Sequence, residues 1–179
     1  MANTLLLTIR ALRFAAEAHV DQRRKGNRGE PYINHLIEVA HLVAEATEGE
    51  DTTAIAAALL HDSVEDTAVT HTDLATSFGE EIASIVDEVT DDKTMKFAER
   101  KALQVERAPN LSPRAKIIKL ADKTSNVRSL VQSPPDWPPD RLRDYVDWSI
   151  KVIEGCRGAS PYLEARFDEA VAAFRDAYR

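Results

Sequence analysis

Four ionisable side chains stand within six residues of the sequence: His61, Asp62, Glu65 and Asp66. They follow directly after the apolar run AIAAALL, residues 54–60. On a helix, residues three or four positions apart lie on one side, so all four side chains would point into one broad sector. Three carboxylates in one sector repel each other, and a bound cation with oxygen and nitrogen ligands is the simplest way to hold them together.

A metal site of this kind needs further ligands from elsewhere in the chain, and His35 and Asp122 are the candidates. Two imidazoles and two carboxylates suit Mn, Fe or Zn better than Ca. Six-coordinate geometry would leave two positions open for ligands from outside the protein, one of them water. A buried structural hydrogen bond is the alternative for His61 and Asp62 taken alone. An uncompensated acidic cluster would be costly, so the larger set of residues favours a metal.

Apolar residues at helical spacing predict the elements that must position these side chains. We expect a helix cap at Asn34 and another at Asp51 or Thr52. Four prolines in PPDWPP break the chain before the last two helices. The pattern predicts an all-α protein, with helices over about 4–24, 31–47, 51–66, 71–78, 80–89, 93–108 and 114–131, and two more from about Arg141 and from Pro161.

Composition limits the class of protein further. A chain of 179 residues is one ordinary domain, here residues 1–179, long enough to bury a core. The net charge of −7 argues against general binding to nucleic acid or to a membrane surface. The apolar stretch LLLTI, residues 5–9, is too short for a signal peptide or a membrane span. The lone Cys156 cannot form an internal disulfide, which favours a cytoplasmic location.

Several stretches together resemble a known family. RRKGNRGEPYINH, AALLHDSVEDT, DEVTDDKT, ERK and KLADKTSNVRSL occur in the order and at the intervals of the hydrolase domain of RelA/SpoT homologues, which cleave the alarmone (p)ppGpp. The likeness covers roughly residues 10–150 and is greatest to the stand-alone small alarmone hydrolases, including the metazoan Mesh-type proteins. The resemblance implies a single HD-domain helical bundle with a metal site at its centre.

The resemblance also implies roles for individual residues. One Mn²⁺ ion is the expected cofactor, although other divalent metals are compatible with the site. Glu65 is the candidate to orient or deprotonate the attacking water, and Asp66 is the candidate to hold that network. The positions that match the family's metal ligands are His35, His61, Asp62 and Asp122.

The substrate carries four or five phosphate groups, so an anionic protein must concentrate cations at its pocket. Arg24 and Lys25, in the basic run RRKGNR, are the pair expected at the phosphates or against the purine. Asn126 matches a family position near the ribose and the metal. Arg141 and Tyr145 match positions that contact phosphate or sugar. The run could also be a solvated loop, Asn126 could bond only to the backbone, and Tyr145 could only fill the core.

Two positions depart from the family pattern. Many relatives carry a basic residue where this chain has Phe97, and an aromatic residue or histidine where it has Ser125. Lys96 could replace the missing charge, but one residue on a helix turns a side chain by about 100°. The outer contacts of the pocket are therefore expected to differ from those of relatives.

The implied function is hydrolysis of (p)ppGpp to GDP or GTP and pyrophosphate, by a metal-bound water that attacks the 3′-pyrophosphate. One alternative is a phosphatase for NADPH or another phosphorylated nucleotide on the same site. A second is a non-catalytic alarmone-binding sensor, against which the intact Glu65 and Asp66 argue. A small nucleotide is thus the expected partner, and the sequence is also compatible with a homo-oligomer.

Overall fold

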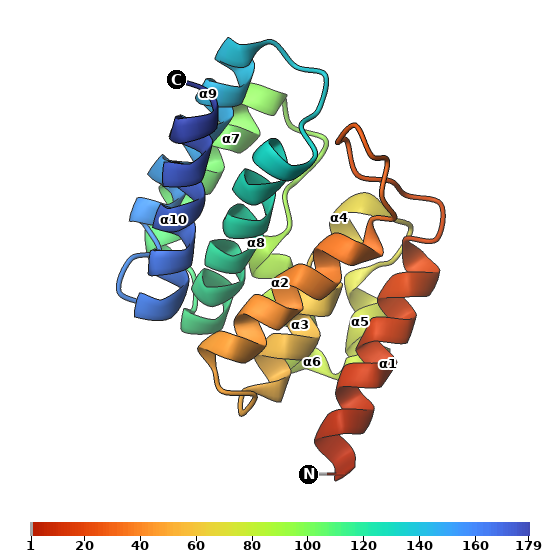
Figure 1. Cartoon of the computed structure of the whole chain (residues 1–179). Coiled ribbons are helices and arrows are strands. Elements are labelled where there is room, and N and C mark those ends of the chain that lie inside the picture. The colour runs from red at the N-terminus through yellow and green to blue at the C-terminus, as the bar shows by residue number, and fades with distance from the viewer. Residues whose placement is uncertain (1) are drawn as a thin grey trace.

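The computed structural model describes residues 2–179, and these form helices and connecting loops without a strand (Figure 1). The one pairing of β type among the described residues is an isolated bridge between Arg23 and Pro31. The structure confirms the expected all-α class. The helices are α1 (Ala2–Ala18), α2 (Ile33–Ala46), α3 (Thr52–Leu60), α4 (Ser63–Asp66), α5 (His71–Phe78), α6 (Glu80–Val89), α7 (Phe97–Arg107), the 3₁₀ helix η1 (Ala108–Asn110), α8 (Pro113–Gln132), α9 (Pro139–Glu154) and α10 (Pro161–Ala177).

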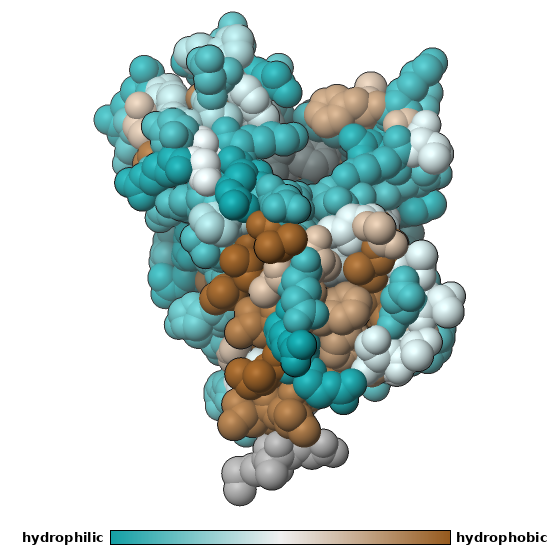
Figure 2. Space-filling model, turned by 90° about the vertical axis from the view of Figure 1, so that its right-hand side faces the viewer, coloured by the Kyte–Doolittle hydropathy of each residue, from teal (hydrophilic) through white to brown (hydrophobic). Residues whose placement is uncertain are grey.

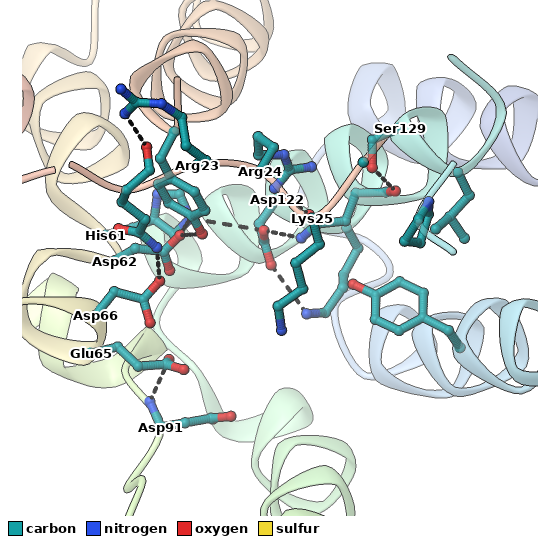
Figure 3. A pocket seen from close by; sticks show the side chains of 18 of the residues that line it. Arg23, Arg24, Lys25, His61, Asp62, Glu65, Asp66, Asp91, Asp122 and Ser129 are labelled. Atoms are coloured by element: carbon teal, nitrogen blue, oxygen red, sulfur yellow. Dashed lines mark hydrogen bonds and ion pairs between the residues drawn. The ribbon is translucent and has the colours of Figure 1, made fainter. Parts of the chain in front are cut away.

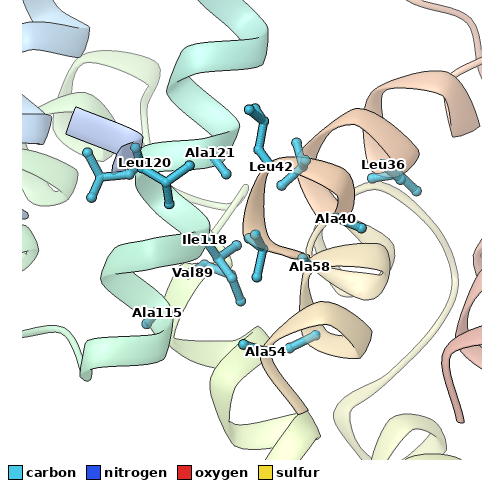
Figure 4. Packing of buried hydrophobic residues seen from close by; sticks show 14 of the residues in the cluster. Leu36, Ala40, Leu42, Ala54, Ala58, Val89, Ala115, Ile118, Leu120 and Ala121 are labelled. Atoms are coloured by element: carbon cyan, nitrogen blue, oxygen red, sulfur yellow. The ribbon is translucent and has the colours of Figure 1, made fainter. Parts of the chain in front are cut away.

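The core lies where α2, α3 and α8 meet, and α10 packs along α8 on the side away from α3 (Figure 1). Every residue of α3 from Ala54 to Leu60 is buried, and four of these seven are alanines, which lets neighbouring helices approach closely. Figure 4 shows Ala54 and Ala58 of α3 beside Ile118 of α8. A helix buried on all sides thus brings His61, which directly follows it, into the centre of the protein.

The prediction of one continuous helix over 51–66 is wrong. α3 ends at Leu60, His61 and Asp62 form a turn, and α4 begins at Ser63. The Nδ1 atom of His61 lies 2.8 Å from the carbonyl oxygen of Ala58, a side-chain contact that competes with the regular helix. The backbone N–H of Asp66 still donates to the oxygen of Asp62 at 2.9 Å, so helical spacing persists across the break.

The first helix also ends earlier than predicted, at Ala18 instead of about Arg24. The residues after it form a loop closed by two backbone hydrogen bonds, from Arg24 N–H to Glu30 at 2.9 Å and from Tyr32 N–H to Gln22 at 3.0 Å. α2 is preceded by Tyr32, which makes no side-chain cap, so the expected cap at Asn34 is wrong, whereas Asp51 caps α3 as expected.

The basic loop, residues 19–32, is fastened to the end of α8. The N–H of Asn27 donates to the oxygen of Pro134 at 3.1 Å, and the N–H of Arg28 donates to Oγ of Ser133 at 3.2 Å. A Cβ atom at Gly26 would overlap the carbonyl oxygen and Oγ of Ser133, so glycine is needed for this close approach. The loop is thereby held over one side of the central site.

Two surface properties complete the description. Figure 2 shows apolar side chains gathered on the face formed by α1, where Leu5, Leu6 and Ile9 are all more than half exposed. Within residues 2–179, no helix combines the length and the apolar character needed to cross a membrane.

Candidate metal centre and its pocket

Two imidazoles and two carboxylates converge at the centre of the fold. Ligand atoms of His35, His61 and Asp62 all lie within 4.8 Å of one another, as in a metal site. Asp122 of α8 adds a fourth group, because its Oδ1 lies 3.3 Å from Nε2 of His35 and 3.8 Å from Nε2 of His61. The structure therefore brings together all four residues that sequence analysis chose as ligands.

The two imidazoles present the same nitrogen to this centre. Nδ1 of His61 is bound to the Ala58 carbonyl, and Nδ1 of His35 lies 2.9 Å from Oγ of Ser125. Both Nε2 atoms are buried, and neither makes a hydrogen bond with any residue in 2–179. Carboxylate oxygens lie nearby, with Nε2 of His61 3.1 Å from Oδ2 of Asp62, but the angles are not those of hydrogen bonds. Unpartnered nitrogens that face carboxylates fit a metal ion.

A relay of hydrogen bonds fixes the orientation of His35. The Ser125 hydroxyl donates to Oε2 of Glu38 at 2.7 Å, so its oxygen is left to accept the Nδ1–H of His35. Arg128 stands on the other side of Glu38, with Nη1 3.5 Å from Oε1. This arrangement selects the tautomer in which Nε2 carries a free lone pair, which is the form a metal binds. Ser125 thus lies behind the metal centre and not at the outer pocket.

The charges of the four groups depend strongly on one another. Burial lowers the pKa of His61, but Asp62 and Asp122 outweigh it and raise that pKa to about 10. Burial raises the pKa of both carboxyls, but His61 holds that of Asp62 and Lys123 holds that of Asp122 well below the usual range. Burial lowers the pKa of His35. The carboxylates therefore remain ionised and stabilise a positive charge between them, either a proton or a metal ion.

Further donors hold the two aspartates in place. The Tyr32 hydroxyl donates to Oδ2 of Asp62 at 2.6 Å. Lys123 donates to Oδ2 of Asp122 at 3.1 Å, and the amide of Asn126 donates to Oδ1 at 2.5 Å. Such partners orient ligands and leave little freedom for the carboxylates to turn away from the centre.

The acidic pair lies beside this centre on α4. Glu65 is about one-fifth exposed and accepts the backbone N–H of Asp91 at 3.1 Å. Burial, together with the charge of Asp62, raises the pKa of Glu65. Asp66 accepts from Nε2 of Gln22 at 2.7 Å and pairs with Lys93. Glu65 is therefore the carboxylate of the pair that is poised to take up a proton.

A cavity of about 490 Å³ opens over these groups. Figure 3 shows Asp62, Glu65, Asp66 and Asp122 around it, with Arg23 and Arg24 above them and Lys25 beside Asp122. Its wall includes the expected binding residues Arg24, Lys25, Asn126 and Tyr145, and all the expected ligands except the more deeply buried His35.

Three contacts show where basic residues lie relative to this cavity. Arg24 donates from Nη1 to Oδ1 of Asn126 at 3.0 Å, which joins the basic loop to α8. The guanidinium of Arg141 is not part of the wall among the described residues, and it stacks on Trp137 at 4.2 Å from the ring centroid. The ring centroid of Phe97 lies 5.8 Å from the guanidinium carbon of Arg100. Phe97 is 64% exposed, so the position where many relatives carry a cation faces solvent here.

Sequence analysis missed several residues of this wall. Their residue types are common in loops or on helix surfaces, so the sequence did not mark them as binding residues. These residues are Gln22, Tyr32, Lys119 and Lys123. Arg100 lies within the ERK stretch that resembles the family, but the sequence predicted no catalytic or binding role for it.

Comparisons with known proteins agree with this geometry. The HD-domain family model matches residues 11–145. Guanosine-3′,5′-bis(diphosphate) 3′-pyrophosphohydrolase MESH1 of Xenopus tropicalis is 44% identical over 94% of each chain. The human protein of the same name is 45% identical over 87% of this chain and 88% of its own.

More distant and structural relatives extend the comparison. A guanosine-3′,5′-bis(diphosphate) 3′-pyrophosphohydrolase of Aquifex aeolicus is 40% identical over 68% of this chain but only 17% of its own, longer chain. A solved structure described as a metazoan ortholog of SpoT that hydrolyzes ppGpp superimposes with a TM-score of 0.89, at 40% identity over 93% of this chain and 94% of that one. The chain therefore belongs to the HD-domain family, among the relatives of the MESH1 hydrolases.

Proposed function

We propose that this protein is a metal-dependent guanosine-3′,5′-bis(diphosphate) 3′-pyrophosphohydrolase, an enzyme that cleaves (p)ppGpp to GDP or GTP and pyrophosphate. One observation carries the proposal. The Nε2 atoms of His35 and His61 are buried, have no hydrogen-bond partner within residues 2–179, and face two aspartates at the base of a cavity of about 490 Å³. The activity in the names of relatives that match over most of their length supports the same conclusion.

In this proposal His35, His61, Asp62 and Asp122 hold one divalent ion. The donor set of two nitrogens and two carboxylates suits a transition metal, and Mn²⁺ is the ion we assign. A bound ion would lower the pKa of water and neutralise phosphate oxygens. The Ser125–Glu38 relay and the donors from Tyr32, Lys123 and Asn126 would keep the ligands oriented.

The protein's own groups handle the water and its proton. A water oxygen forms a bond to the phosphorus that carries the ribose O3′, the P–O3′ bond breaks, and O3′ leaves with a proton. Glu65 accepts the proton from the water, a role supported by its raised pKa and its place on the cavity wall. Asp66, held by Gln22 and Lys93, orients the same water network.

Cations around the cavity are placed to bind the substrate. Arg24 and Lys25 reach the wall from the basic loop and supply charge for phosphate groups. Tyr145 lies beside Trp137, with 6.1 Å between their ring centroids, and the base would lie there. Asn126 bonds to Arg24 and Asp122, and the ribose would lie near it. Arg141 remains a predicted substrate contact. Because its guanidinium stacks on Trp137, it would contact only the part of a bound nucleotide that extends past Trp137.

The remaining organisation is part of the proposal. Residues 2–179 pack around a single core, in keeping with one HD domain over 1–179. Cys156 is buried and burial raises its pKa to about 11, so the thiol is kept unreactive, as suits a protein of the cytoplasm. A homo-oligomer remains a prediction that light scattering would test.

Incubation of metal-stripped protein with ppGpp, with and without Mn²⁺, tests the proposal. We expect GDP and pyrophosphate to appear only with metal. Asp62→Asn and Asp122→Asn should abolish the reaction, whereas Arg143→Gln, which removes an exposed charge of α9, should not. Release of orthophosphate from NADPH with no cleavage of ppGpp would replace this function by the phosphatase. Tight binding of ppGpp without any product would replace it by the sensor.

A further inference from the structure

The cavity has a second basic end, formed by α7 and α8, that the proposed roles leave unused. Arg100 and Gln104 of α7 and Lys119 of α8 line the main cavity there. The same three residues also line a small recess of about 20 Å³ that adjoins it. This end borders Glu65, and α7 packs against α9, the helix that carries Tyr145.

The guanidinium of Arg100 forms a loose ion pair with Glu65 and a cation–π contact with Phe97, and its hydrogen-bonding capacity is not fully used. Its Nη1 lies 3.9 Å from Oε1 of Glu65, which is longer than a hydrogen bond. Its Nε is buried and has no hydrogen-bond partner anywhere in the described chain. A buried guanidinium N–H without an acceptor is costly, and an anion in the cavity would supply one.

Lys119 adds a second cation with spare donors. Its side chain is buried, and Nζ donates to the carbonyl oxygen of Val89 at 3.0 Å. An ammonium group has three N–H donors, so this bond uses one of them. Burial lowers the pKa of Lys119, a cost that a bound anion would reduce.

The acidic groups that face these cations are largely occupied. Glu65 accepts the N–H of Asp91, and the carboxylate of Asp91 accepts from Nε2 of Gln104 at 2.5 Å. The carboxylate of Asp92 accepts from the N–H and hydroxyl of Thr94 at 2.8 and 2.6 Å. None of these carboxylates makes a hydrogen bond to Arg100 or Lys119 in the part of the chain that the structure describes.

We infer that Arg100 and Lys119 form an anion subsite for the distal phosphate of the substrate's 3′-diphosphate. The inference rests on the proposed function, because it takes the phosphorus attached to O3′ to lie between the metal ligands and Glu65. The nucleoside extends towards Trp137 and Tyr145, so the remaining phosphate must lie at another part of the wall. The α7–α8 end offers Arg100, whose Nη1 lies 3.9 Å from Oε1 of Glu65, and Lys119 on the same cavity wall.

Binding of inorganic pyrophosphate and orthophosphate to the Mn²⁺-loaded protein tests the subsite without turnover. We expect Arg100→Gln to weaken pyrophosphate binding by about 10- to 100-fold, the worth of a charged hydrogen bond, and to change orthophosphate binding less than about threefold. Arg107→Gln is the matched control, because it removes the same charge from the same helix at a residue that lines only the recess. It should leave both affinities unchanged.

Kinetics with two nucleotides give a second readout. For ppGpp, Arg100→Gln should lower kcat/KM by a similar factor, mostly through KM. For the analogue with a 3′-monophosphate, the effect should be small. Lys119→Met should act in the same direction, with its melting temperature measured because the residue is buried.

Two results would overturn the inference. Equal loss of kcat for both nucleotides with unchanged pyrophosphate affinity would mean that Arg100 acts by positioning Glu65. Equal weakening of pyrophosphate and orthophosphate would mean a general charge effect. If wild-type protein does not cleave ppGpp, the proposed function fails, yet the comparison of the two inorganic anions still decides whether the subsite exists.

Discussion

The hydroxyl of Ser125 should control how tightly the metal is held. Ser125→Ala removes the group that accepts from Nδ1 of His35 at 2.9 Å and donates to Glu38 at 2.7 Å. His35 could then turn, or adopt the tautomer whose Nε2 carries a proton and cannot bind a metal. Loss of an outer partner of this kind weakens metal binding about 10- to 100-fold, which is about 1.4–2.7 kcal/mol.

The assay is competition for Mn²⁺ between the protein and a fluorescent chelator, with free Mn²⁺ followed by electron paramagnetic resonance. Glu38→Gln keeps an acceptor oxygen for the Ser125 hydroxyl but removes its charge, so its effect should be smaller, about threefold to tenfold. Ser149→Ala is the control: Ser149 is also buried, and its hydroxyl donates to the backbone oxygen of Tyr145.

Stability must be measured alongside the affinity. Ser125→Ala leaves a buried Nδ1–H without an acceptor, so the metal-free protein should lose about 1–3 kcal/mol of unfolding free energy. A folded Ser125→Ala protein that binds Mn²⁺ as tightly as wild type would refute the reasoning. So would an equal loss of affinity in Ser149→Ala.

The remaining predictions concern protons, the basic loop and the core. Because its pKa is about 10, His61 is charged at pH 8 in the metal-free protein, and metal binding should release about one proton from it. The affinity for Mn²⁺ should therefore rise by up to about tenfold per pH unit towards pH 10. Calorimetry in two buffers that shows no proton release would contradict this. Gly26→Ala should separate the loop from Ser133 and raise KM for ppGpp more than it lowers kcat; an unchanged KM would count against the loop as a phosphate site. Glu65→Gln should lower kcat by about 100-fold or more while metal affinity stays the same, and equal losses in both would show that Glu65 is a ligand. Phe167→Ala should cost about 3–5 kcal/mol of unfolding free energy by denaturant titration, because this side chain is fully buried, and a loss below 1 kcal/mol would argue against the packing of α10.

Hydrophobic spacing was enough to predict the class of fold, because each long helix buries one regular face. It also led to the central cluster, because a bound cation is the simplest way to hold several acidic residues together at the end of an apolar helix. It could not predict the turn at His61 and Asp62, because that break depends on a side chain bonding to the Ala58 carbonyl. Nor could it predict the end of α1, because the loop after it is closed by one hydrogen bond from Arg24 to Glu30 and one from Tyr32 to Gln22.

The residues around the ligands escaped prediction for a different reason. Ser125 looked like a departure at the outer pocket, but it lies fully buried behind His35 and bonds to Glu38, which is 87 residues away in the chain. Arg100 had no predicted role, and only the fold brings it next to Glu65. Such pairings depend on which helices are neighbours, and local sequence carries little of that information.

Because α8 is long, it couples the metal-binding side of the pocket to the basic loop. This helix carries Asp122 and Asn126 near its middle, and Ser133, which directly follows it, fastens the basic loop through Asn27 and Arg28. A 20-residue helix is a stiff rod of about 30 Å. A shift of α8 along its axis would therefore carry the metal-side carboxylate and the phosphate-side arginines in the same direction. Because α10 packs along this rod, a force applied to the last helix would reach both halves of the pocket at once.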